Sequence, residues 1–144
     1  MSRETINDGL ILFALRKELG SLPESGDVVV TFDIFRRALC CGLDVGSERT
    51  VRRHWKRMIS EGSLVRKDEC TCVLPVQALM NNRIRPAGFA VRECMNHHPE
   101  GFSLNDVMDS GAPSEHSAMR VLDDFCSRGL LLETRGDGRV FKPI

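Results

Sequence analysis

The stretch SERTVRRHWKRMISEGSLV (residues 47–65) decides how this chain is interpreted, because the stretch SEHSAMRVLDDFCSRGLLL (residues 114–132) repeats its pattern 67 positions later. Both copies begin with Ser-Glu, and both have a glycine near the end, Gly62 and Gly129. The apolar positions also coincide, in the pairs Val51 and Ala118, Trp55 and Leu122, Met58 and Phe125, and Ile59 and Cys126. A repeat of this length indicates two structural units of the same kind.

Each part of the repeated stretch has a physical reason to form a helix and then a hairpin. Ser47 and Ser114 can cap the first free N–H groups of a helix, and the Glu that follows suits the positive end of its dipole. Apolar residues at i, i+4, i+7 and i+8 form one buried stripe, and the glycine can adopt the left-handed conformation that ends a helix. Two β-rich runs follow in each copy, at residues 64–67 and 70–74 and at residues 130–134 and 139–141, and Asp137-Gly138 is a strong hairpin signal.

The segments upstream of the two copies correspond as well. A long helix, a short β-like segment and a shorter helix are expected at residues 5–19, 28–31 and 33–42, and again at 86–98, 101–103 and 104–109. The predicted organisation is a first domain at residues 1–75, a linker at 76–85 and a second domain at 86–144. The predicted fold class is mainly α (α+β), with three helices and a small β-hairpin in each domain.

This order of elements resembles the winged helix-turn-helix family, which is familiar from prokaryotic and archaeal transcription regulators. The resemblance covers nearly the whole chain and depends on an apolar pattern, not on an invariant motif. It implies two tandem winged-helix domains, in which the third helix is the recognition helix and the hairpin is the wing. It also implies that the chain is a DNA-binding protein, and we expect it to act in transcription regulation.

The first copy carries the stronger signal for nucleic-acid contact. On an ideal helix with Arg52 at zero, Lys56 falls near 40°, Arg49 near 60°, Arg53 near 100° and Arg57 near 140°, whereas the apolar residues fall roughly between −120° and −20°. A recognition helix needs such an arc of cations to neutralise phosphates. From Arg49 to Lys67 the chain has one acidic residue and seven basic ones, which are the candidate contacts Arg49, Arg52, Arg53, Lys56, Arg57, Arg66 and Lys67. A solvated helix face and a surface for an acidic protein partner are the alternatives.

The second copy differs at the same positions. Asp123 and Asp124 stand where Lys56 and Arg57 stand in the first copy, and two carboxylates would repel phosphates. Its wing is more promising, because Arg135 and Arg139 flank a Gly-Asp-Gly tip and could reach a phosphate or a minor groove. We therefore expect one copy to bind nucleic acid and the other to make protein contacts.

Composition sets limits on the function. The net charge is zero, with 20 basic and 20 acidic residues, which argues mildly against nucleic-acid binding. No stretch is long and apolar enough to span a membrane, and no signal peptide is recognisable, so a cytoplasmic protein is expected. Nucleophile-elbow, P-loop and Gly-rich dinucleotide motifs are absent, so neither an enzyme nor a cofactor is predicted.

The six cysteines do not predict a metal site. Cys70 and Cys72 would share one face of a strand, but the usual zinc knuckle is CxxC, which the chain lacks. Cys40 and Cys41 could in principle complete a four-thiol zinc site with Cys70 and Cys72, whereas Cys94 and His98, one helical turn apart, have no obvious third ligand. Free thiols in a reducing compartment are therefore expected, with no bound metal.

An interaction module is the competing function, because tandem winged helices also occur as scaffold subunits of larger complexes. The zero net charge and the acidic third helix of the second copy favour it. The helix at residues 5–19 has more apolar residues than one core-facing stripe needs. A homodimer or a protein partner is therefore possible through this helix or through the second domain, and a dimer would present two basic helices to a palindromic site.

Overall fold

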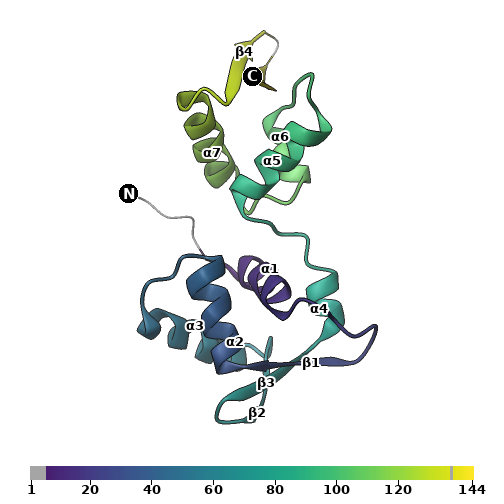
Figure 1. Cartoon of the computed structure of the whole chain (residues 1–144), viewed down its shortest axis with the longest axis vertical. Coiled ribbons are helices and arrows are strands. Elements are labelled where there is room, and N and C mark those ends of the chain that lie inside the picture. Colours follow the sequence, from purple (N-terminus) through teal and green to yellow (C-terminus); the bar gives the residue numbers. More distant parts are fainter. Residues whose placement is uncertain (1–5, 137) are drawn as a thin grey trace. The chain divides into compact units, whose positions relative to one another are not determined.

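The computed structural model describes residues 6–136 and 138–144, which form two compact units, residues 6–82 and 83–144 (Figure 1). Both units combine helices with short antiparallel strands, so the chain has a mixed helix-and-strand fold. Residues 1–5 and Asp137 lie outside the described residues, and with them the first residue of the expected 5–19 helix and part of the expected Asp-Gly turn.

The N-terminal unit places three helices before a hairpin, as the sequence predicted. Its caps explain the helix starts: Asn7 and Ser47 each accept a hydrogen bond from a backbone N–H three residues later. The expected helix at 33–42 is an α-helix that continues as a short π-helix. The elements in chain order are α1 (Asp8–Leu19), β1 (Asp27–Thr31), α2 (Phe32–Arg37), the π-helix η1 (Ala38–Gly42), α3 (Glu48–Ser60), β2 (Val65–Asp68), β3 (Thr71–Pro75) and α4 (Val76–Met80).

A three-stranded antiparallel sheet closes this unit on one side. β3 lies between β1 and β2, and Val73 pairs with Val29 on one neighbour and with Val65 on the other. Val30 and Cys72 alternate with these residues and are fully buried against the helices. A register shift between Arg66 and Asp68 interrupts the β2–β3 ladder at the tip of the hairpin.

Helix α4 corrects the expected linker. Residues 76–85 were predicted to join two domains, but Val76 and Leu79 on α4 are buried in the core of the N-terminal unit. α4 packs against α1, which also contacts α2 and η1. Several of the extra apolar residues of α1 belong to the core of this unit: Ile11, Ala14 and Leu15 are buried in it, and Leu12 and Leu19 are packed at its edge. Leu10 is also buried, and Phe13 is half-buried.

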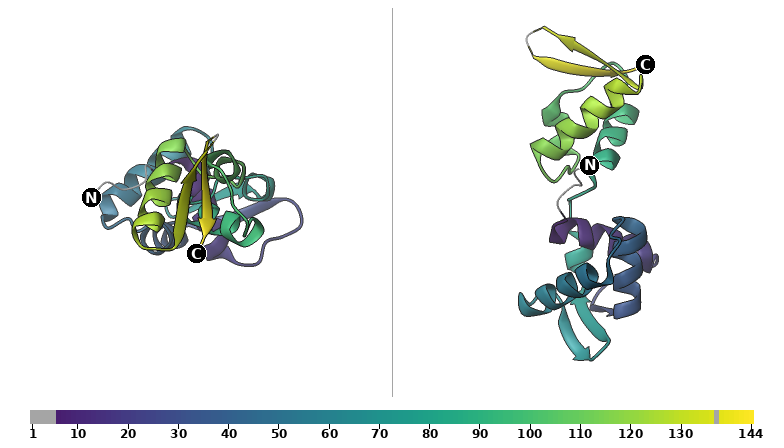
Figure 2. Two further views of the ribbon diagram at one scale, coloured as in Figure 1. Left: turned by 90° about the horizontal axis from the view of Figure 1, so that it is seen from above. Right: turned by 90° about the vertical axis from the view of Figure 1, so that its left-hand side faces the viewer.

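The C-terminal unit repeats this order, with a two-stranded hairpin in place of the three-stranded sheet. Ser103 and Asp106 form a reciprocal capping box at the start of its second helix. Where a β-segment was expected at residues 101–103, a single bridge is found: the backbone groups of Phe102 and Phe141 exchange two hydrogen bonds of 2.8 Å. Figure 2 shows the hairpin on one side of the three helices. The elements are α5 (Ala87–His97), α6 (Leu104–Asp109), α7 (Glu115–Ser127), β4 (Leu131–Arg135) and β5 (Arg139–Pro143).

The two units correspond residue by residue around their third helices. Asp44 and Gly111 both have positive φ angles, 56° and 108°, in the turn before the helix. Val45 and Ala112, the next residues, are both buried. Gly62 and Gly129, which both follow the helix, have φ angles of 83° and 77°, as their helix-ending role requires. The repeat seen in the sequence is thus a repeat of backbone structure.

Candidate nucleic-acid interface

Helix α3 separates an apolar side from a basic side. Val51, Trp55 and Met58 are buried, and Trp55 packs edge-on against Phe32 and Phe35 with ring centroids 5.4 and 5.1 Å away. The sequence prediction that Trp55 is a core residue is therefore confirmed. The predicted cations lie on the other side, where Arg49, Arg52, Arg53 and Lys56 are exposed. We call these four residues the basic face of α3.

Most of the basic face is available for an external anion. Arg49, Arg53 and Lys56 have no ion pair or hydrogen bond with any residue that the structure describes. Arg52 is held more firmly: its guanidinium lies 4.8 Å from the centre of the Phe32 ring and 3.8 Å from a Glu48 carboxylate oxygen. A guanidinium fixed against an aromatic ring loses less conformational freedom on binding than a free side chain does. The contact with Phe32 could not be predicted from the repeated stretch, which begins at Ser47, after α2.

Arg57 differs from the other predicted cations, because it is engaged within the unit. Its Nη1 atom lies 2.7 Å from Asp8 Oδ1 and 3.0 Å from Glu61 Oε2, and its Nη2 atom lies 3.1 Å from the His54 ring. Burial alone would lower the pKa of Arg57, but its close contacts with the carboxylates of Asp8 and Glu61 outweigh it and raise the pKa. Burial, and then the charges of Arg57 and Arg53, lower the pKa of His54. Arg57 is therefore half-buried and already paired.

The hairpin of the N-terminal unit adds mixed charges. Arg66 and Lys67 are exposed on β2, as expected of contact residues. Arg66 Nε donates to the carbonyl of Asp68 at 3.2 Å, and Asp68 in turn accepts from the Cys70 backbone at 2.9 Å. Because Asp68 and Glu69 are also exposed at this tip, the hairpin is less basic than the face of α3.

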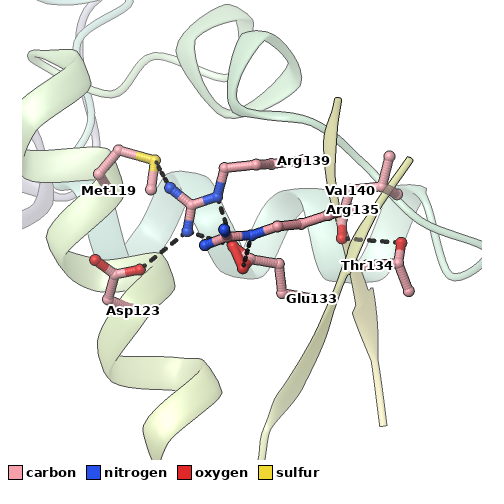
Figure 3. A network of polar contacts seen from close by, with 7 residues as sticks. All are labelled: Met119, Asp123, Glu133, Thr134, Arg135, Arg139 and Val140. Carbon is pink, nitrogen blue, oxygen red and sulfur yellow. Dashed lines mark hydrogen bonds and ion pairs between the residues drawn. The ribbon is translucent and has the colours of Figure 1, made fainter. Parts of the chain in front are cut away.

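In the C-terminal unit the predicted wing arginines are neutralised by the unit itself (Figure 3). Arg139 pairs with Glu133 and, at 3.3 Å, with Asp123 on α7, and Arg135 pairs with Glu133 at 3.4 Å. The hydrogen bond from Arg139 lowers the pKa of Glu133, and the hydrogen bond to Glu133 raises the pKa of Arg139. Arg139 thus connects the hairpin to α7, a contact that the sequence prediction did not include.

The cysteines are scattered, and one expectation about them is wrong. Cys70 and Cys72 do not share a strand face: Cys70 is exposed before β3 begins, and Cys72 is buried in the core. Burial raises the pKa of Cys72 and of Cys94, whose Sγ lies 3.4 Å from Ser110 Oγ. Among residues 6–136 and 138–144, no three His, Cys, Asp or Glu side chains come together as metal ligands.

The candidate interface is therefore the basic face of α3, with Arg66 and Lys67 following it along the chain. In the described part of the chain, no helix is long and apolar enough to cross a membrane. Comparison of the chain with protein-family models, with curated proteins and with solved structures returned no match. What the chain binds is inferred from the charge, exposure and geometry of α3.

Proposed function

We propose that the N-terminal unit binds duplex DNA through the basic face of α3, and that the chain consists of two tandem winged-helix units. The observation that carries the DNA proposal is the exposure of four cations on one side of a helix, three of them without a partner among the described residues. Exposed lysines and arginines usually alternate with acids on a solvated helix, whereas here the nearest acids on α3 are Glu48 and Glu61, at its two ends.

The shape of the unit suits this role. α3 has 13 residues and is about 20 Å long. A helix with its side chains is about 10–12 Å across, which fits a major groove about 12 Å wide. The order helix, strand, helix, helix, hairpin in the N-terminal unit supports the winged-helix assignment, and the C-terminal unit has the same order with a single bridge at Phe102 in place of the strand. A regulator of transcription is the role that this fold suggests, and no catalytic motif in the sequence argues for a reaction.

Protein binding by the C-terminal unit is the second candidate function. α7 exposes Asp123 and Asp124 where α3 exposes cations, and the outer side of the β4–β5 hairpin exposes Leu132 and Val140 by 55% and 40%. Two exposed aliphatic side chains on one face of a hairpin, beside an acidic helix, offer a surface that a protein partner could cover. A homodimer through α1 has less support, because Ile11, Ala14 and Leu15 are buried in the core of the N-terminal unit, and Leu12 and Leu19 are packed at its edge.

A salt titration tests the DNA proposal. The full chain is titrated against a labelled 20-base-pair duplex of random sequence, with fluorescence anisotropy as the readout, at several salt concentrations. Each phosphate contact contributes roughly −0.9 to the log–log slope of affinity against salt, so four contacts predict a slope between about −3 and −4. The variant Arg49→Ala/Arg53→Ala/Lys56→Ala should retain a slope of about −1.

The matched control removes charge elsewhere in the same unit. Arg16 and Lys17 are exposed on α1, and the variant Arg16→Ala/Lys17→Ala should bind the duplex nearly as the original chain does. Equal losses in both variants would mean that total charge, and not the face of α3, attracts the DNA. Absence of salt-sensitive binding at micromolar concentration would exclude the DNA proposal and leave protein binding as the function to test.

A further inference from the structure

Arg57 looks like a fifth member of the basic face in sequence, but its contacts assign it another task. We infer that Arg57 is a positioning residue that holds α3 on α1 through Asp8, and that it does not contact phosphate. This inference rests on the proposed DNA binding by α3. It divides the five cations of α3 into four that face a ligand and one that orients the helix.

The contacts of Arg57 all lead back into the unit. Its Nη1 atom is shared between Asp8 on α1 and Glu61 at the end of α3, at 2.7 and 3.0 Å. Its Nη2 atom contacts the ring of His54, one turn earlier on α3. Two carboxylates and an imidazole therefore surround one guanidinium, which leaves little of it for a phosphate. We call Asp8, His54, Arg57 and Glu61 the Asp8 clasp.

The position of Arg57 on the helix explains why it can reach α1. With Arg52 at zero, the basic face covers about 0° to 100°, and Arg57, Glu61 and His54 fall near 140°, 180° and 200°. These three residues thus form the border between the basic face and the buried side of α3. A long side chain at such a border can extend toward the neighbouring helix, whereas one at the centre of the exposed arc cannot.

Asp8 depends on this contact. Its Oδ1 atom is shielded from solvent and accepts no aligned hydrogen bond from the described residues, so the Arg57 ion pair is its compensation. A buried carboxylate oxygen without a compensating charge is costly, because it has lost its water. Removal of either partner should therefore loosen α3 on α1, and a loosened helix must be ordered again when it binds.

In the C-terminal unit the position of Arg57 is taken by Asp124. It pairs at 3.4 Å with Arg128, the residue that caps the same helix, and both side chains are more than half exposed. At this position an ion pair with another helix is therefore found in the unit whose third helix carries the basic face. An ion pair that fixes the orientation of a helix is useful where that helix must match the spacing of phosphates.

The variant Asp8→Asn separates the two possible roles of Arg57. If Arg57 positions α3, loss of the Asp8 charge lowers affinity for the random 20-base-pair duplex at least threefold, and the salt slope stays within about 0.5 of the original because the same phosphates are contacted. If Arg57 contacts phosphate, Asp8→Asn releases it and affinity rises. Glu18→Gln, which removes an acid from the same helix, is the control and should leave binding unchanged.

An exchange of the two charges provides the rescue. Arg57→Ala alone should act as Asp8→Asn does, and the double variant Asp8→Arg/Arg57→Asp should regain most of the affinity. A phosphate ligand could not be rescued in this way, because the exchange places a carboxylate in its position. Affinities are measured below the melting temperature of each variant, so that a difference reports the folded protein and not its stability.

The single tryptophan gives an independent readout of the clasp. Trp55 lies in the core beside α3, so its fluorescence follows unfolding of the N-terminal unit alone. Each single variant should lower the melting temperature of the Trp55 signal by roughly 4 °C. The double variant Asp8→Asn/Arg57→Ala should lower it by less than the sum of the two single losses. The inference is overturned if these losses add, or if Arg57→Ala flattens the salt slope by about 0.9. Failure of the proposed function shows differently, as absent salt-sensitive binding of the original chain, and it removes the DNA-positioning role whatever the melting data show.

Discussion

Helices α3 and α7 occupy the same place in their units, and they differ mainly in the charge of their exposed sides. The buried positions are apolar in both helices, with Val51, Trp55 and Met58 in α3 corresponding to Ala118, Leu122 and Phe125 in α7. The exposed positions have changed sign, since Lys56 corresponds to Asp123. The buried side stays apolar because an unpaired polar group is costly in a core, whereas an exposed side tolerates many changes of charge. The difference therefore lies in what each unit can bind.

The units also use their long-range ion pairs differently. In the N-terminal unit Arg57 connects the third helix to the first, and the basic face remains open. In the C-terminal unit Arg139 connects the hairpin to the third helix, and the hairpin arginines are occupied by Glu133 and Asp123. An arginine forms the long-range ion pair in both units. In the N-terminal unit this pair leaves the cations of α3 exposed, whereas in the C-terminal unit it occupies the hairpin arginine itself.

The largest effect is expected from Gly111→Ala, at a position where the two units differ in backbone contacts. Gly111 has a φ angle of 108°, and a Cβ atom there would lie 2.2 Å from the carbonyl oxygen of Arg83. Backbone strain and this clash should destabilise the C-terminal unit by about 3 kcal/mol or more. Thermal unfolding followed by far-UV circular dichroism should show an early transition, with no change in the Trp55 fluorescence transition of the N-terminal unit.

Gly129→Ala is the control for Gly111→Ala, because Gly129 also has a positive φ angle but nothing lies within 4 Å of its would-be Cβ. Gly129→Ala should lower the free energy of unfolding of the C-terminal unit by only about 1 kcal/mol. Equal losses of stability in the two variants would mean that backbone strain alone accounts for both. The close approach of the Arg83 carbonyl to Gly111 would then not distinguish the units.

A matched pair of single substitutions tests the contrast between α3 and α7. Arg53 and Arg120 occupy equivalent positions, and Arg53 lies beside Lys56 whereas Arg120 is followed by Asp123 and Asp124. Arg53→Ala should cost about 1–3 kcal/mol on a preferred duplex if Arg53 makes a bidentate guanine contact. Arg120→Ala should change affinity little. Comparable losses in the two titrations would show that both units bind DNA through their third helices.

Release of the hairpin arginines should increase DNA binding by a smaller amount. In Asp123→Asn/Glu133→Gln the two carboxylates that hold Arg139 and Arg135 lose their charge. Affinity for random duplex should rise several-fold, and the salt slope should steepen by roughly one to two units as these arginines reach phosphates. The control Glu93→Gln/Glu100→Gln removes two acids from the same unit. If the control raises affinity as much, net charge and not arginine release is the cause.

The smallest effect concerns His54, the one histidine of the N-terminal unit. Its pKa is lowered in the folded state by burial and by Arg57 and Arg53, so the unfolded state binds a proton more readily. Stability should therefore fall as pH decreases through about 6.5 toward the lowered pKa, and it should be unaffected by His54 above that range. Melting of the Trp55 signal at pH 7.5 and 5.5 measures the loss. The variant His54→Gln should lose less stability between pH 7.5 and pH 5.5. An unchanged loss would mean that other groups cause it.

Much of the fold could be predicted from the sequence, because helices, caps and turns depend on residues close together in the chain. The repeat predicted both third helices within one residue of their observed starts, together with their serine caps and their terminal glycines. The buried stripe followed from spacing alone. Helix α4 was missed, because it has five residues and its apolar pattern is too short to distinguish from a linker.

The sequence by itself determined where the charges are and which side of α3 they occupy, because helical periodicity converts position in the chain into direction around an axis. Only the tertiary structure decided which of those charges are available. Arg57 and Arg139 are paired with Asp8 and Asp123, which are distant in the sequence, while Arg49, Arg53 and Lys56 have no partner among the described residues. The pairing of a long side chain depends on which helix or hairpin packs beside it, and that neighbour is set by the core as a whole.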